Sequence, residues 1–123
     1  MSRESVLKTK SFDFAVRTIK LYKYLKKTHN EFELSHQILK AGTSVGALIR
    51  EAEHAESRKD FLHKLNISLK EINETVYWLD LLFATEFINR QMYDSMKADG
   101  EALLKMLIAS LKTTKARSKN FSE

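Results

Sequence analysis

Apolar residues recur along much of the chain at alternating steps of three and four, the spacing of one buried stripe on an α-helix. Between residues 34 and 55 this stripe is unbroken and consists of Leu34, Ile38, Ala41, Val45, Leu48, Ala52 and Ala55. A second unbroken stripe between residues 62 and 83 consists of Leu62, Leu65, Leu69, Ile72, Val76, Leu79 and Phe83. Both stretches are predicted to be amphipathic helices.

The first and last parts of the chain show the same period less regularly. Near the start, one stripe contains Phe12, Ala15, Ile19 and Tyr22, and beside it lie Phe14, Leu21 and Leu25. Near the end, the apolar positions are Met96, Leu103, Leu104, Leu107, Ile108 and Leu111. These two stretches are predicted to be helices with broad buried faces.

Helix boundaries follow from capping residues. Ser57 is followed three residues later by Asp60, which is the pattern of a capping box at a helix start. The polar run 28–31 separates the first two helices, and Asn89 is suited to cap the last one. The predicted helices span 10–28, 34–55, 58–86 and 90–114, followed by a frayed basic tail over 115–123. Because the connections are short, neighbouring helices must be antiparallel. The predicted fold is all-α, a single-domain (1–123) antiparallel up-down-up-down four-helix bundle.

Composition agrees with a nearly all-helical chain and excludes several classes of protein. Among 123 residues there is no proline and glycine occurs three times, so the residues that usually mark turns are scarce. There is no cysteine, which excludes disulfides, thiolate metal sites and a cysteine nucleophile, and favours the reducing cytoplasm. The chain starts with charged residues where a signal peptide would be apolar, and no window resembles a membrane span.

The net charge of +5 is unevenly distributed. Residues 1–30 carry +6 and residues 89–123 carry +3, whereas the segments between them are acidic. Because the first and last helices are neighbours in an up-down bundle, we expect their cations to form one surface for nucleic-acid phosphates, without sequence readout. The alternative is an ordinary solvated basic face. The candidate nucleic-acid-binding residues are Lys20, Lys23, Lys26, Lys27, Lys105, Lys112, Lys115, Arg117 and Lys119.

Metal and catalytic sites are not expected. Two Glu-x-x-His motifs, ending at His36 and His54, resemble those of di-iron bundles. Both fall on the same predicted helix, about 27 Å apart at 1.5 Å per residue, so they cannot share a metal pair. His29 and His63 have no partners in the pattern of a triad or a zinc site. We therefore predict no enzymatic activity, no metal and no cofactor.

Two further features suggest close packing or assembly. Gly42 and Gly46 lie four residues apart within the second helix, where small residues allow a neighbouring backbone to approach. Their surroundings lack the order of a phosphate-binding loop. The third helix carries a second stripe containing Glu71, Glu74 and Trp78. This stripe is a solvated face, or it holds polar partners for other side chains, and we favour a subunit interface.

Three motifs resemble one bacterial family. They are Ala41-Gly-Thr-Ser-Val-Gly-Ala-Leu-Ile-Arg-Glu-Ala52, then Ala55-Glu-Ser-Arg-Lys-Asp-Phe61, then Lys70-Glu-Ile-Asn-Glu-Thr-Val-Tyr-Trp-Leu79. In this order they are similar to the four-helix-bundle proteins encoded in intervening sequences of 23S ribosomal RNA genes and, more distantly, to accessory proteins of diversity-generating retroelements. Ala41 and Leu48 stand where the family often has serine and asparagine.

The resemblance implies a ring-shaped homopentamer without established enzymatic activity. For the retroelement relatives it also implies nucleic-acid binding and a reverse transcriptase as partner. The sequence thus favours a non-enzymatic oligomeric bundle that binds RNA or DNA backbone through its terminal helices. The alternative is a protein-interaction scaffold without nucleic-acid binding.

Overall fold

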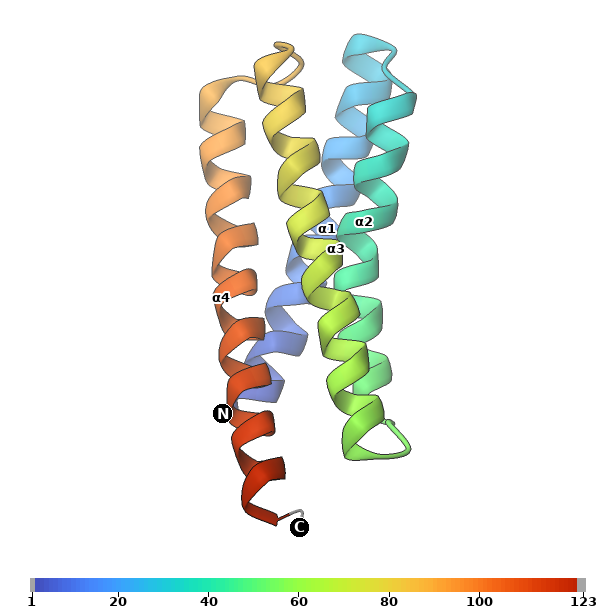
Figure 1. Ribbon diagram of the computed structural model, residues 1–123. Coiled ribbons are helices and arrows are strands. Elements are labelled where there is room, and N and C mark those ends of the chain that lie inside the picture. The colour runs from blue at the N-terminus through green and yellow to red at the C-terminus, as the bar shows by residue number, and fades with distance from the viewer. Residues whose placement is uncertain (1, 122–123) are drawn as a thin grey trace.

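The computed structural model is a bundle of four helices, and it describes residues 2–121, with side chains through residue 117. The helices are α1 (Arg3–His29), α2 (Glu33–Ala52), α3 (Arg58–Ala84) and α4 (Arg90–Phe121). They run alternately up and down, and the part of the chain that the structure describes contains no strand (Figure 1). The predicted all-α four-helix bundle is confirmed.

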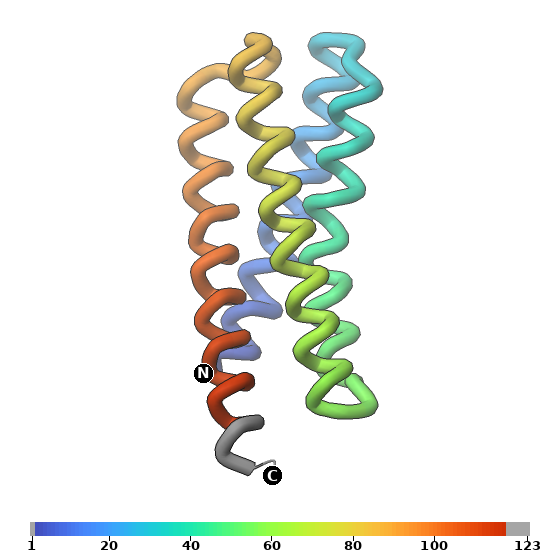
Figure 2. The backbone as a smooth tube through the Cα atoms, viewed as in Figure 1, coloured from blue at the N-terminus to red at the C-terminus, as the bar shows by residue number. Residues whose placement is uncertain are grey.

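Each helix packs against the next one in sequence, and α4 also contacts α1. The smooth trace shows the start of α1 beside the red turns of α4 in the lower half of the bundle (Figure 2). Two side-chain contacts fix how these helices lie relative to each other. Arg3 of α1 donates hydrogen bonds to Thr113 and to the carbonyl oxygen of Ala109 in α4. Arg17 of α1 pairs with Asp99 of α4.

The observed helix ends follow local capping. Ser57 Oγ accepts the Asp60 amide at 3.0 Å, and the Asp60 carboxylate accepts the Glu56 amide at 3.1 Å. Asn89 Oδ1 accepts the Met92 amide at 2.9 Å. These two predicted caps are confirmed.

Glu31 caps α2, since its carboxylate accepts the backbone amides of residues 33–35. Asn30 ends α1 in the left-handed conformation, with φ of 52°, and its amide donates to carbonyls of the last turn of α1.

Three boundaries differ from the predicted ones by three residues or more. Helix α1 begins at Arg3 rather than near residue 10, because Ser2 accepts the Ser5 amide as an N-cap and Leu7 is buried in the core. Helix α2 ends at Ala52 rather than 55, where the amides of residues 53–55 turn to carbonyls three residues back. Helix α4 continues to Phe121, so the expected frayed tail from residue 115 is helical through that residue.

The core is built from one stripe of each helix. The largest fully buried side chains include Phe14, Ile38, Ile72 and Leu107. The predicted buried face of α1 was partly wrong. Phe14, Leu21 and Leu25 face the core, whereas Phe12 is 57% exposed and Ile19 is 39% exposed. The positions that continue the core stripe of α1 include the polar residues Ser11 and Thr18, both fully buried, so the apolar pattern pointed to the wrong side.

Candidate nucleic-acid interface and packing sites

Two stretches of the chain, one mostly in α1 and one mostly in α4, contain several lysines and arginines and no acidic residue. Residues 14–30 contain five lysines and arginines, and residues 102–122 contain five more. In α1 the exposed members are Lys20, Lys23 and Lys27, called here the α1 basic face. In α4 the exposed members are Lys105, Lys112, Lys115 and Arg117, called here the α4 basic face. Among the described side chains, no acid forms an ion pair with either face.

The two basic faces are offset along the bundle axis, whereas we expected one compact surface. Because Arg3 lies beside Thr113 and Arg17 beside Asp99, the α4 basic face lies level with the first turns of α1. The α1 basic face lies instead beside the start of α4. Lys23 and Lys112 are therefore about 30 Å apart along the bundle axis at 1.5 Å per residue. Antiparallel neighbours place the end of the first helix far from the end of the last.

Two of the predicted basic residues stand apart from these faces. Lys26 is half-buried: its Nζ donates to the Tyr22 hydroxyl at 3.1 Å and lies 6.0 Å from the centre of the Phe32 ring. Lys26 therefore packs against the loop between α1 and α2. Lys119 lies outside the described side chains.

Gly42 and Gly46 lie where α1 comes closest to α2. A Cβ atom added at Gly42 would meet the Thr18 side chain at 2.6 Å, and one at Gly46 would meet the Ser11 carbonyl oxygen at 3.3 Å. Both glycines therefore act within the chain, by allowing α1 and α2 to pack closely. The third glycine, Gly100, faces Val76 of α3 in the same way, with a closest contact of 3.2 Å.

The second stripe on α3 contains both apolar and acidic side chains. Trp78 is half-buried and its indole N–H donates to the Glu74 carboxylate at 3.2 Å. Next to it, Tyr77 is 55% exposed. Burial of Glu71, and secondly the negative charge of Glu74, raise the pKa of the Glu71 carboxyl, against the effect of Ser44 and Lys40.

Because the pKa of Glu71 is raised, the folded state binds its proton more tightly than the unfolded state, and this contribution to stability is lost as pH rises through the raised pKa. We therefore expect Glu71→Gln to be more stable than the wild type at pH 7, by less than about 1 kcal/mol. The difference should disappear below the ordinary carboxyl pKa. Urea unfolding at pH 7 and pH 3.5 measures it, with exposed Glu101→Gln as control. Equal stability at pH 7 would show that burial of this charge costs nothing.

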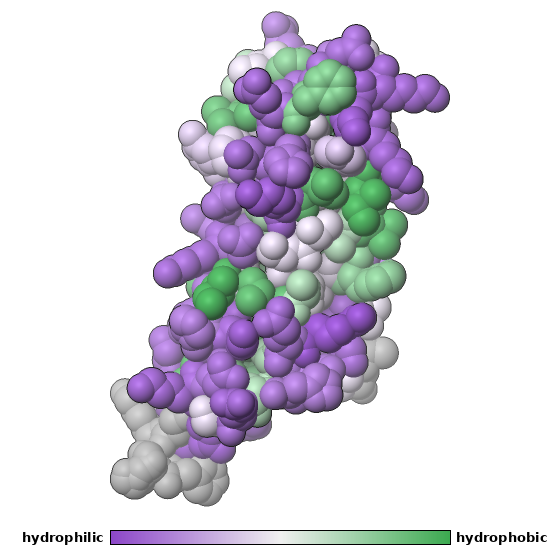
Figure 3. Space-filling view, turned by 90° about the vertical axis from the view of Figure 1, so that its right-hand side faces the viewer, coloured by the Kyte–Doolittle hydropathy of each residue, from purple (hydrophilic) through white to green (hydrophobic). Residues whose placement is uncertain are grey.

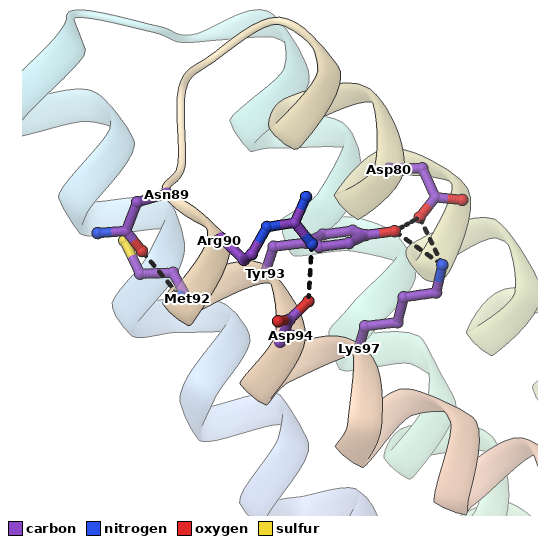
Figure 4. A network of polar contacts seen from close by, with 7 residues as sticks. All are labelled: Asp80, Asn89, Arg90, Met92, Tyr93, Asp94 and Lys97. Atoms are coloured by element: carbon purple, nitrogen blue, oxygen red, sulfur yellow. Dashed lines mark hydrogen bonds and ion pairs between the residues drawn. The ribbon is translucent and has the colours of Figure 1, made fainter.

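A polar cluster joins α3 to α4 near the loop between them (Figure 4). The Tyr93 hydroxyl donates to Asp80 Oδ1 at 2.6 Å, and Lys97 Nζ donates to both, at 2.7 Å and 3.2 Å. The hydrogen bonds that Lys97 donates, first the one to Tyr93 and then the one to Asp80, raise the pKa of Lys97, so the ammonium stays charged. Tyr93 also stacks on Phe83, with ring centres 4.4 Å apart. The cluster fixes two helices and contains no nucleophile with a free base.

The residues that the structure describes offer neither a metal site nor a membrane-spanning helix. Within it, no group of three or more His, Asp or Glu side chains is placed to hold a metal ion. The helices searched there include none with the length and apolar character that crossing a bilayer requires.

Comparison with known proteins identifies the family. A family model described as 23S rRNA-intervening sequence protein matches residues 3–109. The chain belongs to this family. A solved structure from Bacteroides thetaiotaomicron, described as a protein of unknown function from the S23 ribosomal protein family, is 53% identical with a TM-score of 0.89. The alignment covers 90% of this chain and 99% of that one. No curated protein matches.

The motifs that suggested the 23S rRNA-intervening sequence family have structural roles in this chain. Gly42 and Gly46 set the approach of α1 to α2, and Ser57 with Asp60 starts α3. Thr75, from the third motif, is fully buried and donates to the Glu71 carbonyl oxygen at 2.7 Å. These residues explain the fold of the family. Both basic faces lie outside the three motifs.

An exposed apolar surface escaped sequence reasoning. Phe12 and Ile19 of α1 are exposed, and Phe12 also lines a shallow groove of about 680 Å³ between α1 and α2, together with Ala47. Figure 3 looks onto this side and shows apolar side chains gathered at its mid-height. The sequence did contain a signal for this surface. The first helix has two apolar stripes, and a helix that buries a single face needs only one.

Proposed function

We propose that the protein is a non-enzymatic, cytoplasmic homo-oligomer that binds the sugar-phosphate backbone of RNA or DNA. The observation that carries the binding proposal is the pair of acid-free helical segments, whose exposed lysines have no ion-pair partner among the described side chains. A free row of ammonium groups attracts phosphates and releases their counterions. With exposed base-stacking aromatics scarce on both faces, binding depends on the backbone and not on sequence.

The binding proposal is tested by titrating a fluorescein-labelled single-stranded RNA and a duplex DNA with the wild-type protein. If the α4 basic face contacts four phosphates, log K should fall with log salt with a slope of about −2.8 for a single strand. Raising the salt from 50 to 200 mM should then weaken binding about 50-fold. No binding at 25 mM salt refutes the proposal and leaves the scaffold alternative.

Assembly is supported by two different exposed apolar surfaces on one chain. One comprises Phe12 and Ile19 of α1, and the other comprises Tyr77 and Trp78 of α3. Helices α1 and α3 are diagonal in the bundle, and no Cα atom of one lies within 8 Å of a Cα atom of the other. Two unlike surfaces joined head to tail give a closed ring when the rotation closes, and the family resemblance favours five subunits.

We expect the wild type to elute as an oligomer, and Ile19→Asp and Trp78→Asp each to yield monomer, because either change places a charge in one half of every contact. Ile108→Asp is the matched control, since Ile108 is 36% exposed on α4 and belongs to neither surface. Light scattering coupled to size exclusion measures the mass. A wild type that stays monomeric at 200 μM contradicts the assembly proposal.

A further inference from the structure

One aromatic side chain lies outside the core at the upper end of the bundle, in the loop that joins α1 to α2 (Figure 1). Phe32 is 57% exposed and does not belong to the core. It holds the N-cap position of α2, where Ser, Thr, Asp and Asn are preferred because their side chains accept a backbone amide. The Phe32 side chain makes no such bond. Neither burial nor capping therefore explains a phenylalanine at this position.

The backbone on both sides of Phe32 is fixed by hydrogen bonds. The Glu31 carboxylate accepts the amides of residues 33–35 at 2.7 to 3.2 Å. The Phe32 carbonyl oxygen accepts the His36 amide at 3.3 Å, and the amides of Asn30 and Glu31 donate to carbonyl oxygens in the last turn of α1. The loop thus presents an exposed ring on an ordered backbone, which reduces the entropy lost when a ligand binds.

Lys26 lies against one face of this ring. Its Nζ is 6.0 Å from the centre of the Phe32 ring and 4.8 Å from the centre of the Tyr22 ring, and it donates to the Tyr22 hydroxyl at 3.1 Å. Both distances to ring centres are within the range of cation–π contacts. Because Lys26 is over one face and more than half of Phe32 is exposed, a flat partner has access to the opposite face.

The charges around Phe32 favour an anionic partner on the α1 side of the ring. Lys27, the last member of the α1 basic face, directly follows Lys26 and is exposed. Among the described side chains, no acid forms an ion pair with this face. Of the two acids beside Phe32 in the chain, Glu31 is engaged in capping, and Glu33 is exposed in the first turn of α2. Phosphates are therefore drawn towards α1 and away from Glu33.

We propose that Phe32 is a stacking platform for an unpaired base of a nucleic-acid strand whose phosphates lie along the α1 basic face. The base stacks on the ring face turned away from Lys26, and Lys27 attracts the adjacent phosphate. Unpaired bases commonly stack on aromatic side chains beside a basic surface, and every base has a flat face to offer. The inference rests on the proposed function and adds to it a preference for single strands over duplexes, without sequence readout.

Two substitutions of Phe32 separate the ring from its apolar character. Phe32→Leu keeps an apolar side chain but removes the ring, whereas Phe32→Tyr keeps the ring. We expect Phe32→Leu to weaken binding of single-stranded RNA at 50 mM salt about tenfold, within the range for one stacked base, and to leave duplex DNA binding unchanged. Phe32→Tyr should bind like the wild type. Equal RNA binding by the two variants, measured by fluorescence anisotropy, overturns the proposal.

A fluorescent reporter at the same position tests stacking directly. In Phe32→Trp an indole replaces the phenyl ring, and a base stacked on an indole quenches its fluorescence. The wild type, whose single tryptophan is Trp78 of α3, is the control. Titration with a short oligouridylate should quench Phe32→Trp clearly more than the wild type. Equal quenching of the two proteins overturns the proposal, because no base would then lie on the ring at position 32.

The outcomes separate the platform from the proposed function and from a contact between subunits. If Phe32→Leu binds RNA like the wild type and binding remains salt-dependent, the platform is refuted and backbone binding stands. If the wild type binds no strand at low salt, both are refuted. If Phe32→Leu has a lower mass than the wild type by light scattering, Phe32 is a subunit contact and the platform is refuted. Weaker RNA binding at unchanged mass is the expected result.

Discussion

Replacing Gly42 by leucine is expected to lower the free energy of unfolding by about 3 kcal/mol. Even the first added atom, Cβ, would lie 2.6 Å from both Cγ2 and Oγ1 of Thr18. Thr18 is fully buried, and its hydroxyl donates to the Phe14 carbonyl oxygen at 2.8 Å, so the side chain cannot turn away without losing that bond. Helices α1 and α2 would have to separate. Thermal or urea unfolding followed by circular dichroism measures the loss.

A double-mutant cycle isolates this contact. Gly42→Ala alone should destabilise, since the clash exceeds the roughly 1 kcal/mol that alanine gains over glycine in a helix. In a Thr18→Ala background both 2.6 Å contacts are gone and only the Cβ of residue 18 remains, at 3.1 Å, so the same substitution should be much less destabilising. An identical effect of Gly42→Ala in both backgrounds would show that the close approach of α1 to α2 does not depend on this pair.

The second large effect concerns charge on α4. Changing Lys105, Lys112 and Lys115 together to glutamine should weaken RNA binding at 50 mM salt about 100-fold and reduce the magnitude of the salt slope by about 2, because three phosphate contacts are lost. These lysines are exposed and have no ion pair with a described residue, so the fold should be unaffected. Fluorescence anisotropy over four salt concentrations measures both quantities.

The matched control changes three exposed lysines elsewhere, Lys40, Lys59 and Lys70, to glutamine. Both triple variants have the same net charge, so any difference between them reflects position alone. We expect the control to lose less than about threefold. Equal losses in the two variants would mean that net charge, and not the α4 basic face, determines binding.

The helices and most of their caps could be predicted from the sequence because their signals are local. Ser57 and Asn89 act within one turn of their own positions. The buried side of α1 could not be predicted in the same way. Its core stripe contains Ser11 and Thr18, whose small size lets Gly46 and Gly42 approach, and this pairing is a property of two helices together.

The sequence shows which lysines are candidates for binding, but not how they are arranged in space. Clusters of lysine at both ends of the chain were visible, but their separation depends on the register between α1 and α4, which the contacts of Arg3 and Arg17 determine. No pattern within one helix indicates that register.

The central claim, that nucleic-acid backbone binds on the α4 and α1 basic faces, is tested most directly by photo-crosslinking. A 4-thiouridine-labelled RNA is crosslinked to the wild-type protein at 50 mM salt, and the attached peptides are identified by mass spectrometry. We predict crosslinks within residues 102–117 and 14–30, which hold the two acid-free segments. Crosslinks confined to α2 and α3, or none at all, would contradict the account.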